Sequence, residues 1–223
     1  ACIGKWVQLA FLMEGSTAKL YVDGKLAGEG DFKCDVTKLF SGGAAKREMN
    51  MTLGTPSCWP DGAMDAALDN VEIYDRALTE AQLKALRPDE GGDQPAEERL
   101  PVAYYTFDNG ALTDYSGNGY NAKAVGGANG DQQPSFVEAE GHGLAYELNN
   151  KGLTNVSDES NGIRLPKGVN EALKSAKGVT IMMDAYVHAA NKQGGWIDIS
   201  NGVGNVDKNE YVVVLMDCFN RNT

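Results

Sequence analysis

A strand that leads directly into a short helix, at residues 68–86, constrains the fold more than any other feature of this 223-residue chain. Val71, Ile73 and their apolar neighbours indicate a strand. Thr79 then stands where a helix N-cap is expected, and Leu83 lies on the apolar face of the helix that would follow. The segment therefore predicts a sheet strand that ends in a turn and a small helix.

Strand patterns also fill most of the chain before that segment. Alternating or apolar runs predict strands at residues 5–12, 19–22, 25–28 and 51–54. The Asp23-Gly24 pair, which joins the second of these runs to the third, is a typical hairpin signal. The 27 glycines of the chain fit the many tight turns of an all-β fold.

One segment, residues 88–99, has the composition of a linker. It is polar and acidic, contains two prolines and shows no periodicity. Strand patterns resume after it, and strands are expected at residues 100–108, 143–148, 163–166, 179–187, 196–200 and 211–216. The linker therefore divides the chain into residues 1–87 and residues 100–223.

Motifs on both sides of the linker resemble signatures of laminin-G-like domains, which have a concanavalin A-like jelly-roll fold. Leu-Asp-Asn-Val-Glu-Ile-Tyr-Asp-Arg-Ala-Leu, at residues 68–78, resembles the closing strand and turn of such a domain. Leu-Tyr-Val-Asp-Gly-Lys, at residues 20–25, resembles a hairpin of the same domain type, and Tyr-Tyr-Thr-Phe-Asp, at residues 104–108, its opening strand. The resemblance implies an all-β fold, a two-sheet antiparallel jelly-roll sandwich.

The order of these motifs is reversed relative to the family. Residues 1–87 resemble its C-terminal half and residues 100–223 its N-terminal half. We expect the halves to close into one sandwich, as a circularly permuted chain or through domain swapping in a homo-oligomer, because half a jelly roll would expose long sheet edges. The alternative is that the chain holds parts of two tandem domains. Closure predicts that Cys2 and Cys218 lie close together, and a disulfide between them is one option.

Composition narrows the classes of partner. The net charge of -11 argues against nucleic acid, because phosphates would be repelled. No run approaches the roughly 18 apolar residues of a membrane helix, so no membrane insertion is expected. The four cysteines are widely scattered without a Cys-x-x-Cys pair, which argues against a zinc site built from them.

The chain shows no hydrolase motif. Retaining β-glucanases carry two carboxylates about 5–5.5 Å apart, often at alternating positions of one strand. Asp69 and Glu72 are three residues apart, a spacing that predicts opposite faces of a strand, and Asp184 has no evident partner. His142 and His188 are far apart in the sequence, with no Ser or Cys motif nearby. We therefore expect a protein that is not an enzyme.

Calcium is the cofactor that the resemblance implies. In concanavalin A-like sandwiches, an Asp near the start of the last strand often binds a structural calcium with groups from the first strand. Asp69 and Asp108 correspond to these two positions, and we expect them to be metal ligands. The loop at residues 114–119 also has the Asp, Asn and Gly content of a calcium loop, although an ordinary tight turn explains the same residues.

Sugar binding requires an aromatic side chain outside the core, with polar neighbours for the hydroxyl groups. Trp6 and Trp196 lie in apolar strands and are expected in the core, whereas Trp59 lies in a Pro- and Gly-rich loop. Two tyrosines bracket a second loop. The predicted ligand-binding residues are Trp59, Asp61, Tyr115, Asn118 and Tyr120.

Together these features favour a non-catalytic carbohydrate-binding, lectin-like module of a secreted or cell-surface bacterial protein. Its expected partner is a glycan or a surface protein. The alternative is a structural or protein-adhesion domain without a glycan site, because the motifs above are signatures of a fold and not of a ligand.

Overall fold

The computed structural model describes residues 2–32, 34–41, 49–56, 62–87, 100–126, 130–153, 160–189, 194–200 and 212–216. Its strands are β1 (Trp6–Glu14), β2 (Thr17–Val22), β3 (Lys25–Asp31), β4 (Asn50–Leu53), β5 (Asp65–Tyr74), β6 (Ala103–Tyr105), β7 (Lys123–Gly126), β8 (Gly130–Asp131), β9 (Phe136–Ala139), β10 (Gly143–Glu147), β11 (Asn161–Arg164), β12 (Gly178–Ala189), β13 (Gly194–Ser200) and β14 (Val212–Met216). Its helices are α1 (Val36–Ser41), α2 (Glu80–Ala85) and α4 (Lys167–Leu173). No helix among the described residues is long and apolar enough to span a bilayer.

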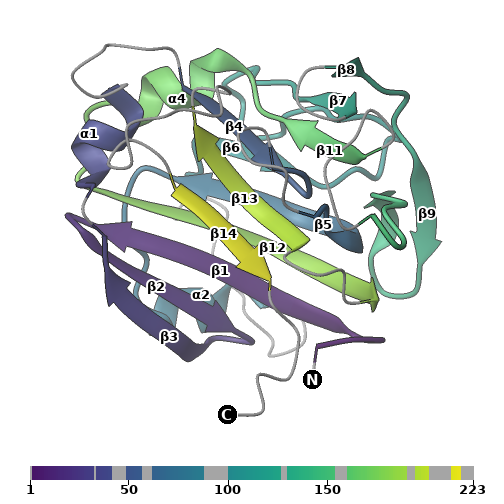
Figure 1. Ribbon diagram of the computed structural model, residues 1–223, viewed down its shortest axis with the longest axis horizontal. Coiled ribbons are helices and arrows are strands. Elements are labelled where there is room, and N and C mark those ends of the chain that lie inside the picture. The colour runs from purple at the N-terminus through teal and green to yellow at the C-terminus, as the bar shows by residue number, and fades with distance from the viewer. Residues whose placement is uncertain are drawn as a thin grey trace.

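The strands form two antiparallel sheets that pack face to face (Figure 1). The first, called sheet A, has the order β3-β2-β1-β12-β5-β10-β9, with β6 also paired to β5. The second, called sheet B, has the order β14-β13-β4-β11-β7-β8. The prediction of an all-β, two-sheet antiparallel sandwich is confirmed.

Strands from the two sides of the linker lie side by side in both sheets. In sheet A, β12 lies between β1 and β5, so a strand of the later segment is inserted between two of the earlier one. In sheet B, β4 lies between β13 and β11. Each sheet of this structure therefore needs both segments. The circular permutation, the tandem-domain alternative and the swapped oligomer stay predictions.

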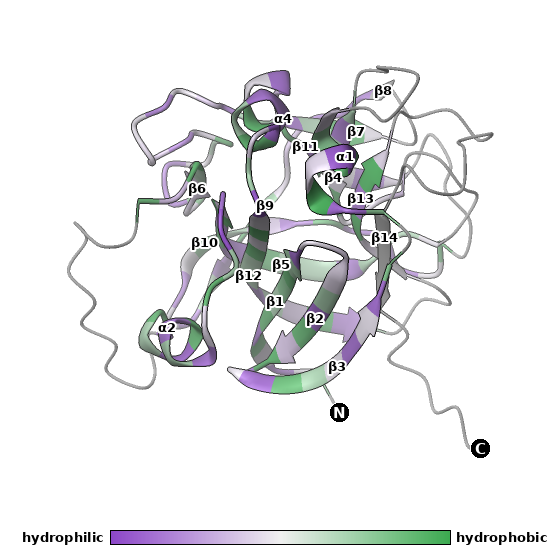
Figure 2. Ribbon diagram, turned by 90° about the vertical axis from the view of Figure 1, so that its left-hand side faces the viewer, coloured by the Kyte–Doolittle hydropathy of each residue, from purple (hydrophilic) through white to green (hydrophobic). Residues whose placement is uncertain are grey.

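The alternation along β1 separates an inner from an outer face of sheet A. Val7, Leu9 and Phe11 are buried in the main core between the sheets. Leu12 belongs to a second cluster with Leu83 of α2. Figure 2 shows α2 on one side of sheet A and β13 and β14 on the other, so this second cluster covers part of the outer face.

The hairpin turn and the helix N-cap expected from the sequence are both present in the structure. Asp23 and Gly24 both have positive φ, 50° and 66°, as a two-residue hairpin between β2 and β3 requires. Thr79 caps α2 through a capping box with Gln82: the Gln82 N–H donates to the Thr79 hydroxyl, and the Thr79 N–H donates to Gln82 Oε1. Helix α1 was not predicted, because its apolar residues lie in a run too short to show a period.

Candidate functional site

A row of polar side chains crosses three neighbouring strands on the outer face of sheet A. Gln8 on β1 pairs with Asp184 on β12, and Asp184 pairs with Asp69 on β5. All three residues are buried, at 5%, 7% and 2% exposure. Burial of three adjacent polar groups is costly unless they find partners, so this row is a candidate site.

A β-bulge on β5 brings Asp69 to this face. Asp184 pairs with Asp69 and Met182 pairs with Glu72, so β5 has one residue more than β12 over this interval. The extra residue falls at Asn70, whose φ is 47°. Asp69 and Glu72 therefore share the outer face. The expectation that their spacing separates them is wrong, because it assumed a regular strand.

Five side chains meet at the bulge. Asn70 Nδ2 donates to Asp69 Oδ2 at 3.1 Å and to Asp184 Oδ2 at 2.9 Å, and its own Oδ1 accepts from the Tyr104 hydroxyl at 3.2 Å. His142 lies in the turn between β9 and β10, and its Nδ1 is 3.0 Å from Asp69 Oδ2 and 3.9 Å from Asp184 Oδ2. The expectation that Asp184 lacks a partner is therefore also wrong.

Burial and hydrogen bonding shift the titration of this group in definite directions. Burial raises the pKa of the Asp69 carboxyl, although the hydrogen bond with His142 opposes the shift. The hydrogen bond to Asp69 raises the pKa of His142, which the charge of Asp184 also favours. The hydrogen bond between Asp69 and His142 thus favours the charged form of each partner, whereas burial favours the neutral form of each.

Trp6 fixes the orientation of His142. The two rings are stacked, with centroids 3.9 Å apart and an interplanar angle of 22°. The ring of Tyr186 meets the same indole edge-on at 5.8 Å. Trp6 was expected in the core. It instead lies on the outer face with partial exposure, because it is in phase with Gln8 and not with Val7.

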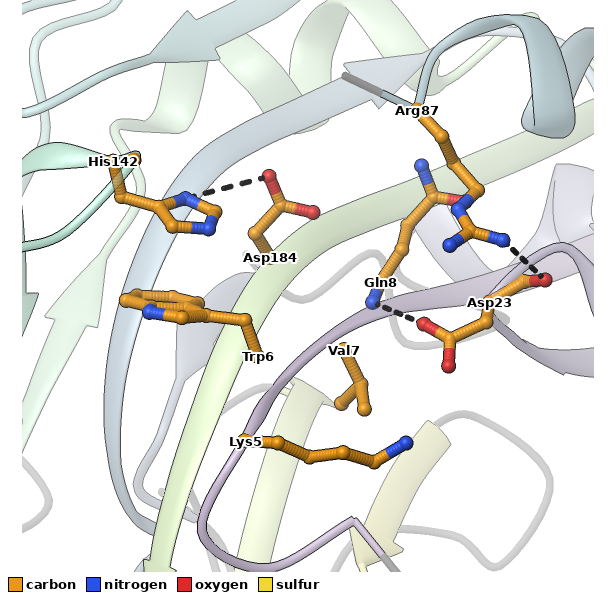
Figure 3. Close-up of a pocket in the computed structure, with 9 residues that line it drawn as sticks. Lys5, Trp6, Val7, Gln8, Asp23, Arg87, His142 and Asp184 are labelled. Carbon is orange, nitrogen blue, oxygen red and sulfur yellow. Dashed lines mark hydrogen bonds and ion pairs between the residues drawn. The ribbon is translucent and has the colours of Figure 1, made fainter. Parts of the chain in front are cut away.

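A pocket of about 570 Å³ opens next to this cluster. Figure 3 shows Trp6 beneath His142 and the side chain of Gln8 beside the guanidinium of Arg87. Asp23 joins two of its walls, since its carboxylate accepts from the Gln8 N–H at 3.0 Å and its carbonyl accepts from Arg87 Nη1 at 3.1 Å.

The Gln8 side chain is the unusual polar group of this pocket. Among the described residues, neither Gln8 Nε2 nor Gln8 Oε1 has a hydrogen-bond partner, although the residue is only 5% exposed. A buried amide without a partner costs about 1–3 kcal/mol of stability. Such a group at the wall of a pocket is typical of a site that a polar ligand completes.

A comparison with known protein families matched the part of the chain that contains β1 and β5, the strands of Trp6, Gln8 and Asp69. Residues 2–84 match the model of the concanavalin A-like lectin/glucanases superfamily. This match confirms the resemblance to laminin-G-like domains, and the matched segment includes β1 and β5, which supply Trp6, Gln8 and Asp69. No curated protein and no solved structure matched the chain. The superfamily includes both lectins and glucanases, so the match is compatible with binding and with hydrolysis.

The two residues predicted to bind calcium lie in the same region. Asp69 is buried in the cluster, and Asp108 is exposed, with Oδ1 packed against Gly143 beside His142. The charge of Asp108 is close enough to raise the pKa of Asp69. The donor set nearest to Asp69, however, includes the nitrogen of His142, whereas calcium prefers oxygen ligands alone.

The loop predicted to bind either calcium or sugar is built around Asp114. Its carboxylate accepts from the backbone N–H of Tyr104, Ser116 and Tyr120, at 3.0, 2.9 and 2.8 Å. These donors occupy the oxygens that a cation would need, so the tight turn is the better interpretation.

The predicted sugar-binding residues of that loop make separate contacts, and their role in binding stays a prediction. Tyr115 is 48% exposed, and Asn118 Nδ2 donates to the carbonyl of Val102 at 3.0 Å. The ring of Tyr120 packs on Gly168 of α4 and against the main hydrophobic core.

Some predicted residues fall outside the described part of the chain. These are Trp59, Asp61 and Cys218. Cys2 is a free thiol, so the disulfide with Cys218 is not formed in this structure. Trp196 is in the core as expected, with Nε1 donating to Met183 Sδ.

Proposed function

We propose that this protein is a non-catalytic carbohydrate-binding module and that the pocket beside Trp6 and Gln8 is its sugar site. The match to a superfamily of lectins and glucanases supports the ligand class. The location differs from the loops expected from the sequence. As part of the same proposal, the module acts outside the cytoplasm, in a secreted or surface-attached protein.

The observation that carries the proposal is the unpartnered amide of Gln8. An amide donates through Nε2 and accepts through Oε1, and neighbouring hydroxyl groups of a sugar ring can satisfy both atoms at once. Trp6 adds an aromatic surface at the same wall, and Asp23 and Arg87 add charged groups at the rim. A mostly preformed pocket with a few convergent polar groups is what sugar recognition needs.

Hydrolysis is a second candidate, because Asp69 and Asp184 do converge. The geometry disfavours it. Their ligand atoms and that of His142 all lie within 4.8 Å of one another, and the two carboxylate side chains are 3% and 9% exposed. A glycosidase needs its carboxylates about 5–5.5 Å or about 6.5–9.5 Å apart with the sugar between them. We expect no reducing ends to be released from polysaccharides. If the protein releases reducing ends and Asp184→Asn abolishes that release, the protein is an enzyme and the binding proposal is wrong.

Gln8→Leu is the sharpest test of the sugar site. Leucine keeps the approximate size of the side chain and removes an unpartnered buried amide, so the free energy of unfolding should stay equal or rise by about 1 kcal/mol. Binding should weaken about 5- to 100-fold, since the ligand loses its hydrogen bonds to the amide. Affinity electrophoresis on a polysaccharide panel measures binding, and denaturant unfolding measures stability.

Tyr115→Ala is the matched control for the alternative location. Tyr115 is the exposed aromatic of the other predicted loop, so its truncation should leave binding unchanged. Loss of binding in Tyr115→Ala with retention in Gln8→Leu would move the site to that loop. Absence of binding to every glycan in the panel would favour the structural or adhesion domain.

A further inference from the structure

We propose that Asp69, His142 and Asp184 bind a divalent transition-metal ion of the Zn²⁺ type, and not Ca²⁺. The three ligand atoms are Asp69 Oδ2, His142 Nδ1 and Asp184 Oδ2. They come from β5, from the turn between β9 and β10, and from β12. The inference concerns this cluster alone and does not depend on sugar binding.

The spacing of the three atoms suits a small ion. Zinc bonds of about 2.0–2.1 Å at tetrahedral angles place neighbouring ligand atoms about 3.3 Å apart. In the cluster, His142 Nδ1 lies 3.0 Å from Asp69 Oδ2 and 3.9 Å from Asp184 Oδ2. These two separations bracket the tetrahedral value, and all three ligand atoms lie within 4.8 Å of one another, which is close enough for one ion to contact all three after the side chains adjust.

The chemistry of the donors selects the class of metal. Imidazole nitrogen suits Zn²⁺ and its first-row neighbours, whereas Ca²⁺ takes six to eight oxygen ligands. Zinc binds carboxylate oxygen as well as imidazole nitrogen, and a site with three protein ligands leaves a fourth position open. A calcium ion bound by Asp69 and Asp108, as expected from the sequence, would lie beside His142 Nδ1 without taking it as a ligand.

Charge and burial also favour a cation here. Two carboxylates, 3% and 9% exposed, converge on a single imidazole, and the nearby charge of Asp108 adds to the negative potential. A divalent ion bound between these groups would balance the charges of the two carboxylates.

The surroundings of the cluster hold its ligands in place. The stacked indole of Trp6 holds the imidazole. Asn70 Nδ2 donates to the same two carboxylate oxygens, so a bound ion must share these oxygens with the amide or displace it. Gln8, the cross-strand neighbour of Asp184, is buried in the wall of the same pocket with its amide unpartnered among the described residues. This amide is a second buried polar group, without a partner in the described part of the chain, in the pocket that His142 and Asp184 also line, and it is not itself one of the three ligands.

The test is titration of metal-stripped protein with Zn²⁺, followed by calorimetry and thermal unfolding. We expect one Zn²⁺ per chain at this site, and at a hundred times the dissociation constant the folded-to-unfolded ratio should rise about 100-fold. His142→Gln should weaken zinc binding at least about 10-fold, and Asp184→Asn should do the same. The unfolding transition of each metal-free variant reports whether it folds.

His188→Gln is the matched control. His188 also contacts a carboxylate, Glu147, at 3.0 Å, but it lies outside the cluster with its side chain 37% exposed. The His188→Gln variant should bind zinc with the same affinity as the unmodified protein. Every variant keeps all four cysteines, so any zinc bound by thiols contributes equally to each measurement. Equal zinc affinity in the His142→Gln and His188→Gln variants would overturn the inference. Stabilisation by Ca²⁺ without any by Zn²⁺ would also overturn it.

Discussion

Replacing Asn150 by alanine is expected to lower the free energy of unfolding by about 3–6 kcal/mol. Asn150 is fully buried. Its Nδ2 donates to the carbonyls of Met64 and Asn161, at 2.9 and 2.7 Å, and its Oδ1 accepts from the Asn161 N–H at 2.7 Å. Alanine would leave these three backbone groups buried without this partner, and each costs about 1–3 kcal/mol.

The position of Asn150 makes this loss important for the whole fold. Met64 lies directly before β5, and Asn161 begins β11, so one side chain joins the entry to a strand of sheet A to a strand of sheet B. A domain of this type has only about 5–15 kcal/mol of stability in total. Denaturant unfolding measures the change, and the midpoint temperature should fall by roughly 10 °C or more.

Asn149→Asp is the control for this prediction. Asn149 is exposed and has a positive φ of 54°, which aspartate also tolerates. We expect a change within about 0.5 kcal/mol. If Asn150→Ala costs less than about 1 kcal/mol, water enters and replaces the amide, and Asn150 does not have the bridging role described above.

Asp114→Asn is expected to cost about 2–4 kcal/mol at neutral pH. The Asp114 carboxylate accepts from three backbone N–H groups and from the Ser116 hydroxyl at 2.8 Å. An asparagine keeps one acceptor oxygen and turns an NH₂ group toward donors that the carboxylate had accepted. Hydrogen bonds to a charged partner contribute about 1.5–3 kcal/mol each, so losing even half of them is large.

The same loss should depend on pH. Burial alone would raise the pKa of the Asp114 carboxyl, but hydrogen bonds from the amides of Tyr104, Ser116 and Tyr120 together hold it below its ordinary value. A group whose pKa is lower in the folded protein stabilises it above the unfolded pKa, about 3.9 for Asp. That contribution disappears as the pH falls through the folded pKa.

Unfolding curves at pH 7, 5 and 3 check this prediction. The difference between the unmodified protein and Asp114→Asn should be full at pH 7 and 5 and smaller at pH 3. Asp75→Asn is the control, because the Asp75 side chain is 55% exposed and its loss should change stability by no more than about 0.5 kcal/mol. A pH-independent difference would mean that the Asp114 carboxylate does not hold the loop through its charge.

Elements that depend on near neighbours could be predicted from the amino-acid sequence. The strand and capped helix at residues 68–86, the Asp23-Gly24 hairpin and most strands of both segments follow from apolar periodicity and turn chemistry. The two-sheet sandwich followed from motifs that resemble a family. These features depend on contacts a few residues apart, so a linear pattern is enough to predict them.

The candidate site could not be predicted from such local patterns. Asp69, His142 and Asp184 lie far apart in the chain, and they meet because β12 pairs with β5 and because a bulge at Asn70 turns Asp69 outward. Neither the pairing nor the bulge has a signal in one sequence. The alternation along β1 puts Trp6 and Gln8 in the same phase, but which phase faces the core depends on the sheet that packs against it, and Trp6 was therefore expected in the core. Strand pairing depends on contacts between residues far apart in the sequence, and these contacts bring Asp69 and Asp184 together.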